Sequence, residues 1–85
     1  MGIHSHLFIE TYTGPVAFGF DRQTDENTVI YYLQKFSDDA VMEQVIPKAS
    51  DTDLEEIFNL ISRMLKKNLS ETEYHRLFLK DNPHE

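Results

Sequence analysis

The sequence contains no cysteine. The chain therefore has no disulfide, no thiolate metal ligand and no cysteine nucleophile, as is usual in a reducing compartment. No apolar run approaches the roughly 20 residues that cross a bilayer, and the N-terminus lacks the basic and apolar regions of a signal peptide. We expect a cytoplasmic protein with no membrane partner.

Basic residues are also scarce. Eight Lys and Arg stand against fifteen Asp and Glu, which gives a net charge of −7. Seven acids and two bases fall in residues 1–47, and eight acids and six bases fall in residues 48–85. Because no stripe of bases is available to follow a phosphate backbone, we expect no direct binding of nucleic acid. The negative charge suits a basic protein partner, although solubility alone also explains it.

The length of 85 residues predicts one domain over 1–85, because such a chain has no room for a second core. Its hydrophobic fraction of 40% and charged fraction of 27% are those of a globular chain rather than a disordered one. A core of this size leaves a net stability of only about 5 kcal/mol. Forming a homodimer would widen that margin.

The clearest element is an amphipathic helix over 51–67. Ser50 is placed to cap its first turn, and Asp53, three residues on, completes a capping box. Acids gather in the first turns and bases in the last, which complements the helix dipole. The pattern Ser70-Glu-Thr-Glu73 predicts a second capped helix over 71–80. Apolar residues at three- and four-residue spacing form one stripe on the first helix: Leu54, Ile57, Phe58, Ile61, Met64 and Leu65.

Two alternating runs, 4–12 and 15–21, predict a β-hairpin, because Thr13-Gly-Pro interrupts the alternation between them. We expect one face of this hairpin to pack against the apolar stripe. We also expect Ile61→Asp to unfold the domain, because it would bury an unpaired charge in that contact. The residues on the packed face are Leu7, Ile9, Thr11, Val16, Phe18 and Phe20.

Residues 28–36 and 40–46 are ambiguous. β-Branched and aromatic residues dominate 28–36 and favour a third strand, with a helix starting near Thr24 as the alternative. Residues 40–46 fit either a fourth strand or a short helix capped by Ser37. With strands favoured in both places, the predicted fold class is α+β: a small antiparallel meander of three or four strands, followed by two helices packed on one face.

Three histidines raise the question of a metal site. On a strand, His4 and His6 point to the same face, and Glu10 follows on that face. Neutral imidazole and carboxylate are suitable zinc ligands. Only two of these ligands lie close together, and His75 would have to come from the helical layer, so we assign no metal and no other cofactor. His75 and Glu71, four residues apart on a helix, form a surface pair more readily than an acid–base couple.

No sequence motif indicates catalysis. No serine lies in Gly-x-Ser-x-Gly, and the glycines lack the spacing of a phosphate-binding loop. Four tyrosines and six phenylalanines, however, are more than one small core needs on its inner faces. Exposed aromatic residues in a patch commonly mark a protein interface. The candidate interface residues, on the outer sheet face and the last helix, are Phe8, Glu10, Tyr12, Tyr31 and Tyr74.

The sequence therefore favours a small acidic regulatory module without enzyme activity. It would act through a protein–protein interface, with a protein partner of unknown identity or as a homodimer. The first alternative is an acidic decoy that imitates nucleic acid and occupies a nucleic-acid-binding protein. The second is a metal-dependent activity built on His4, His6 and His75.

Overall fold

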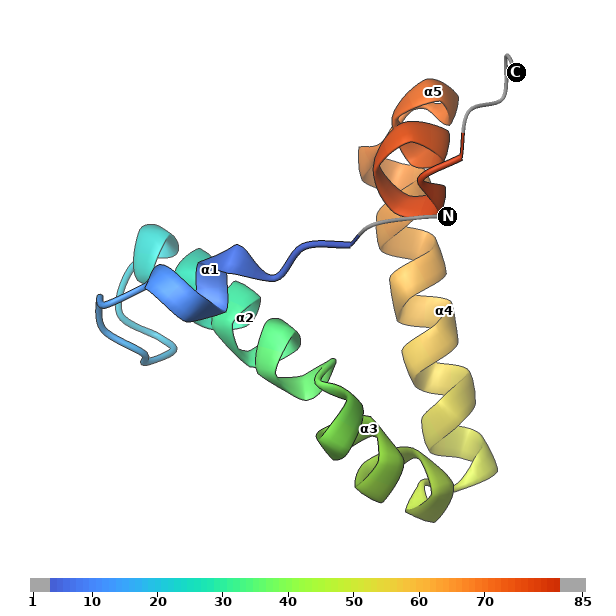
Figure 1. Cartoon of the computed structure of the whole chain (residues 1–85), viewed down its shortest axis with the longest axis horizontal. Coiled ribbons are helices and arrows are strands. Elements are labelled where there is room, and N and C mark those ends of the chain that lie inside the picture. The colour runs from blue at the N-terminus through green and yellow to red at the C-terminus, as the bar shows by residue number, and fades with distance from the viewer. Residues whose placement is uncertain (1–3, 82–85) are drawn as a thin grey trace. The chain divides into compact units, whose positions relative to one another are not determined.

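The computed structural model describes residues 4–81, and every regular element in this range is a helix (Figure 1). The predicted α+β fold is wrong, because none of the proposed strands at 4–12, 15–21, 28–36 and 40–46 forms in the described range. In chain order the elements are α1 (Leu7–Thr11), α2 (Arg22–Phe36), α3 (Asp39–Val45), the 3-10 helix η1 (Ile46–Lys48), α4 (Asp51–Asn68), α5 (Glu71–Glu73) and the π-helix η2 (Tyr74–Leu79).

The chain divides into two compact units. The first comprises Ser5–Lys48 and holds α1, α2, α3 and η1, and the second holds α4, α5 and η2. The helix expected over 51–67 is confirmed as α4, whereas the helix expected over 71–80 forms as the three-residue α5 followed by the π-helix η2. The sheet on which they were to pack is missing from the described range. One domain over 1–85 stays a prediction.

α2 occupies the segment in which a strand was favoured. The carboxylate of Asp21 accepts a hydrogen bond from the backbone N–H of Thr24 at 2.8 Å and so caps the first turn. Within the helix, Arg22 and Glu26 form an ion pair one turn apart, with 2.6 Å between Nε and Oε2. These local bonds favour a helix strongly enough to override the β propensity of the run that begins at Thr28.

α3 is a short helix where a fourth strand was favoured. Its cap is Asp38, whose carboxylate accepts from the N–H of Ala40 at 2.9 Å. The helical alternative for 40–46 is therefore correct except for its cap. Ser37 instead ends α2, and its hydroxyl donates to the carbonyl of Gln34 at 3.1 Å.

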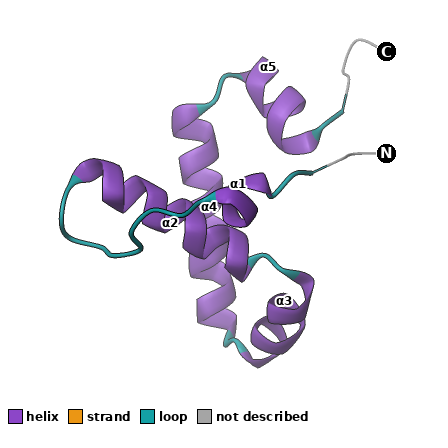
Figure 2. Cartoon of the chain, turned by 60° about the vertical axis from the view of Figure 1, so that its left-hand side comes forward, coloured by secondary structure: helices purple, strands orange, loops and turns teal. Residues whose placement is uncertain are grey.

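A short helix and a long loop replace the predicted hairpin. Figure 2 shows α1 lying beside α2, where the N–H of Ile9 donates to the side-chain oxygen of Gln34 at 3.0 Å. An irregular loop then leads to the start of α2. In this loop Gly19 has a φ of 102°, a backbone region that favours glycine, and its N–H donates to the carboxylate of Asp25 at 2.8 Å.

α4 begins as the sequence predicts. The hydroxyl of Ser50 accepts from the N–H of Asp53 at 3.0 Å, and the Asp53 carboxylate accepts from the N–H of Ser50 at 3.2 Å. These two bonds complete the expected capping box. At the other end, the side-chain amide of Asn68 donates to the carbonyl of Met64 at 2.9 Å. The 18 helical residues span about 27 Å.

A second capping box starts the last helical segment. The N–H of Ser70 donates to the Glu73 carboxylate at 2.8 Å, and the Ser70 hydroxyl accepts from the N–H of Glu73 at 3.1 Å. The bonds from Ser70, helped by the charge of Arg76, hold the pKa of Glu73 below its ordinary value of 4.5. The segment then widens into η2, which ends at Lys80 in the left-handed region with a φ of 59°.

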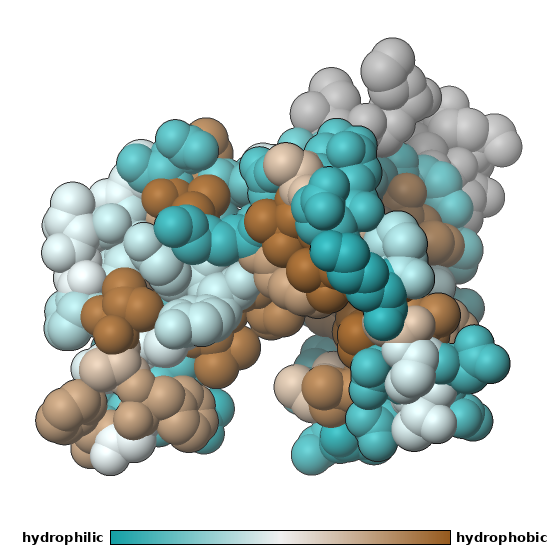
Figure 3. All heavy atoms as spheres, turned by 90° about the horizontal axis from the view of Figure 1, so that it is seen from below, coloured by the Kyte–Doolittle hydropathy of each residue, from teal (hydrophilic) through white to brown (hydrophobic). Residues whose placement is uncertain are grey.

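Apolar side chains in residues 4–81 are not buried. Thr28, with 5% of its surface exposed, is the single buried residue in this range. Large apolar side chains lie at the surface of each unit, as the brown areas in Figure 3 show. Folded monomers of this size usually bury about 60% of the surface of the unfolded chain, chiefly apolar. Residues 4–81 instead leave their large apolar side chains wholly or partly at the surface.

Candidate protein-binding surface

Three of the five predicted interface residues form one aromatic cluster. Phe8 on α1 stacks on Tyr12, the C-cap residue of α1, with ring centroids 4.8 Å apart. Tyr12 also contacts Tyr31 on α2 edge to face, with ring centroids 6.2 Å apart. The ammonium of Lys35 lies 5.4 Å from the centroid of the Tyr31 ring, within cation–π range. All three aromatic residues are half-buried. Their main effect is to hold α1 on α2.

The other two predicted interface residues are not part of this cluster. Glu10 is exposed on α1, where it lines a polar hollow together with His6 and Asp39. Tyr74 belongs to the second unit and stacks on Phe78, with ring centroids 5.4 Å apart. Binding of a partner by the five residues stays a prediction.

A more exposed apolar surface lies where α2 meets the preceding loop. It surrounds a groove of about 310 Å³, which we call the α2 groove. Phe18 is 71% exposed and Tyr32 is 65% exposed. Thr28 also lines the groove and fixes the loop to the helix through two hydrogen bonds to Ala17. The exposed apolar side chains of the α2 groove are Val16, Phe18, Val29, Tyr32 and Leu33.

Sequence reasoning missed the α2 groove because it placed Phe18 on the inner face of a hairpin. The local signal that could have found it is Asp21 followed by Thr24. An aspartate can accept a hydrogen bond from the backbone N–H three residues later, and together with a charged first turn it marks a helix N-terminus. A helix that begins at this point is incompatible with the predicted third strand, and it leaves the loop residues before Asp21 at the surface.

The apolar stripe predicted on α4 forms a second exposed surface. Phe58 is 70% exposed, and Ile61 is also exposed. The hairpin face that this stripe was expected to cover does not form in the described range. The expectation that Ile61→Asp unfolds the domain through that contact therefore loses its basis.

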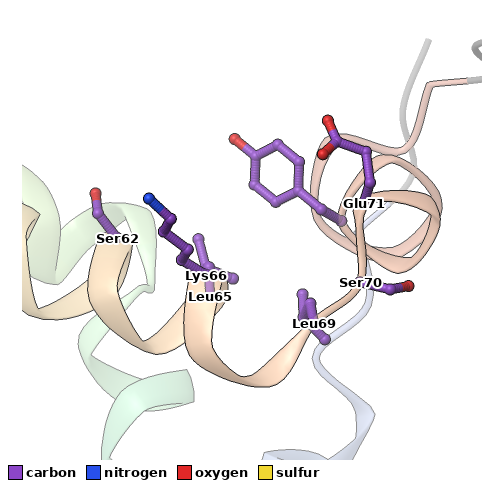
Figure 4. A pocket seen from close by; sticks show the side chains of 7 residues that line it. Ser62, Leu65, Lys66, Leu69, Ser70 and Glu71 are labelled. Carbon is purple, nitrogen blue, oxygen red and sulfur yellow. The ribbon is translucent and has the colours of Figure 1, made fainter.

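Beyond the stripe, the corner between α4 and α5 encloses a pocket of about 380 Å³. Figure 4 shows Lys66 on α4 and Glu71 on α5 at its two sides, with Leu65 and Leu69 between them. The ring of Tyr74 completes the lining. This mixture of aliphatic groups with single charges at the edge is typical of a contact surface.

His6 and His75 each contact polar neighbours within their own unit. His6 Nε2 lies 3.0 Å from the hydroxyl oxygen of Ser37. The predicted surface pair is confirmed, with His75 Nε2 3.8 Å from the Glu71 carboxylate, and His75 Nδ1 also lies 3.0 Å from the carboxylate of Asp81. Over residues 4–81 the structure shows no group of three His, Asp or Glu side chains placed to hold a metal ion.

Within residues 4–81, no helix is both long enough and apolar enough to cross a membrane. No protein-family model matches the chain, and no curated protein or solved structure matches it with significant similarity.

Proposed function

We propose that this protein is a non-catalytic regulatory module that binds another protein through exposed apolar side chains, above all those of the α2 groove. The observation that carries the proposal is the exposure of large apolar residues in both units, with no buried apolar side chain in the described range. Burying one such side chain stabilises a complex by about 1.5–3 kcal/mol. Phe18, Tyr32 and Leu33 together therefore offer enough contact energy to anchor a partner.

The chemistry of the chain favours a protein as the partner. Aromatic and aliphatic side chains in a shallow groove are typical anchors of protein interfaces. The net charge of −7 repels a polyanion such as nucleic acid and attracts a surface with basic residues around its apolar centre. We place this interaction in the cytoplasm, the reducing compartment in which a chain without cysteine is common.

Site-specific photo-crosslinking tests this function. A photoreactive phenylalanine analogue replaces Phe18 in the full chain, which is expressed in its own cells and irradiated. The matched control carries the analogue at Arg22, whose side chain is 88% exposed but lies outside the apolar lining. We expect a discrete protein adduct from position 18 and none from position 22.

A second position makes the test decisive. The analogue at Tyr32 lies in the same groove and is expected to give an adduct of the same mass. Equal labelling at the control position, or no protein adduct from either groove position, would contradict the proposed function. Loss of the adduct on adding Leu33→Ser would tie it to the groove.

A further inference from the structure

α4 carries an apolar surface along most of its length. Leu54, Phe58, Ile61 and Met64 are exposed, and Leu60 beside them is exposed as well. Residues 54, 57, 61 and 64 follow the three- and four-residue spacing that lets one helix pack along another. The 18 residues of α4 provide about two and a half heptads. This surface is long enough for a helical partner and too narrow for a sheet.

The charges of α4 are segregated along its length. Residues 51–59 contain four acids and no base, and residues 60–68 contain three bases and no acid. The helix dipole accounts for this lengthwise order. It does not account for a second regularity: at about 100° per residue, two of these charges border the apolar stripe on the same flank, with Leu60 between them. These charges are Asp53 and Lys67.

We propose that α4 pairs with the α4 of a second copy of this chain, with the two helices antiparallel. The inference goes beyond the proposed function and concerns a different surface, the apolar stripe of α4. In an antiparallel pair, equivalent flanks of the two helices face each other. Asp53 then lies opposite Lys67 of the second copy, and Leu60 lies opposite the Leu60 of the second copy. The two-fold symmetry repeats the charge pair.

The same register places apolar residues opposite apolar residues. Leu54 of one copy lies over Met64 of the other, and Ile57 lies over Ile61, so four layers fill the interface. A parallel pair would instead bring identical residues to the same height and set the acidic halves against each other. Among the ion pairs within residues 4–81, none involves Asp53 or Lys67. The capping bond of Asp53 uses its Oδ2, so Oδ1 can accept from Lys67 of the second copy.

Sedimentation of the full chain and cysteine crosslinking test the pairing. The expected mass is twice the 10.0 kDa of one chain. Because the chain has no cysteine of its own, single cysteines report the register. Under mild oxidation, Leu54→Cys mixed with Met64→Cys should form a mixed disulfide dimer, and neither variant should crosslink with itself. Self-crosslinking of Leu54→Cys would show a parallel pair and overturn the proposal.

Charge reversal tests the flank. Lys67→Glu places like charges opposite each other at both symmetry-related contacts with Asp53, and it should weaken the dimer about five- to tenfold. Adding Asp53→Lys reverses the partner as well and should restore most of the affinity. Lys66→Glu, on the other side of the helix, is the control and should change it by less than about twofold.

The outcomes separate this inference from the proposed function. A chain that stays monomeric at every concentration, while position 18 still crosslinks to a different protein, overturns the pairing and leaves the proposed function intact. A dimer whose affinity is unchanged by Lys67→Glu also overturns the antiparallel register. If position 18 gives no protein adduct but the mixed disulfide forms, the pairing stands and the groove has no partner.

Discussion

The hydroxyl of Thr28 forms two hydrogen bonds with the backbone of Ala17, one as donor and one as acceptor. It donates to the Ala17 carbonyl at 2.9 Å and accepts from the Ala17 N–H at 3.0 Å. Thr28 is also the single buried residue in the described range. These two bonds provide partners for the N–H and the carbonyl of Ala17, a loop residue that belongs to no helix or sheet. They fix the loop on α2 and shape one wall of the α2 groove.

Thr28→Val keeps the size of this side chain but removes both bonds. We expect a loss of about 1–3 kcal/mol in the local stability of the loop, because the part-buried backbone groups of Ala17 lose their partner. Hydrogen exchange of the Ala17 amide measures this loss directly. Thr28→Ser retains the hydroxyl and is the control. Unchanged protection of Ala17 in the valine variant would show that the loop is held by other contacts.

The two capping boxes make a separate prediction. Ser50→Ala removes the acceptor for the N–H of Asp53, and we expect it to cost about 1 kcal/mol and to fray the start of α4. Ser62→Ala, in the middle of the same helix, removes an equivalent hydroxyl without a cap and should slightly raise helicity. Circular dichroism during urea unfolding distinguishes the two. An equal response of both variants would argue against the cap.

The caps were predictable because their signal is local. Ser50 with Asp53 and Ser70 with Glu73 are each contained in four residues, and no tertiary contact is needed to form them. The same signal at Asp21 and Thr24 was present, yet the β-branched run after it favoured a strand. Propensity is a weak prior that an N-cap and a charged first turn can override.

The aromatic cluster shows why the site was predicted only in part. Phe8 and Tyr12 are four residues apart, a spacing that places both on one face of a strand and also on one face of a helix. Their neighbourhood was therefore correct although the element was wrong. Phe18 and Phe20 share a face only in a strand, and for them the error in the element reversed the predicted burial.

Acidification tests the capping box at Ser70. The pKa of Glu73 is lowered mainly by its hydrogen bonds from Ser70, so the ionised carboxylate favours the folded segment. This stability is fully present above about pH 4.5, the ordinary value, and is lost as the pH falls through the lowered pKa. We expect the Ser70 amide to lose its hydrogen-exchange protection in that acidic range.

Two variants control the acid response. Glu73→Gln cannot ionise and should flatten the pH dependence, whereas Glu71→Gln makes the same charge change and leaves the Ser70 bonds intact. A direct titration of the Glu73 carboxyl by nuclear magnetic resonance completes the test. A midpoint at or above 4.5 would remove the physical basis of the prediction.

Gly14 makes a steric prediction about the aromatic cluster. A Cβ at this position would lie 2.5 Å from the hydroxyl oxygen of Tyr12 and 2.7 Å from its Cζ. Gly14→Ala should therefore push the ring away from Tyr31 and break the bond from its hydroxyl to the Pro15 carbonyl, now 2.7 Å. Ring proton shifts of Tyr31 report the displacement. Shifts identical to those of the parent chain would mean that the loop moves instead of the ring.

Truncation of a half-buried phenylalanine should destabilise the chain much more than truncation of an exposed one. Phe8 stacks on Tyr12, so Phe8→Ala should destabilise the first unit by about 2 kcal/mol. Phe20 is 78% exposed, and Phe20→Ser should change the free energy of unfolding by less than about 0.5 kcal/mol. Urea unfolding of the full chain measures both. A large loss for Phe20→Ser would mean that this side chain supports the fold, and that the apolar surface around it is covered rather than open to a partner.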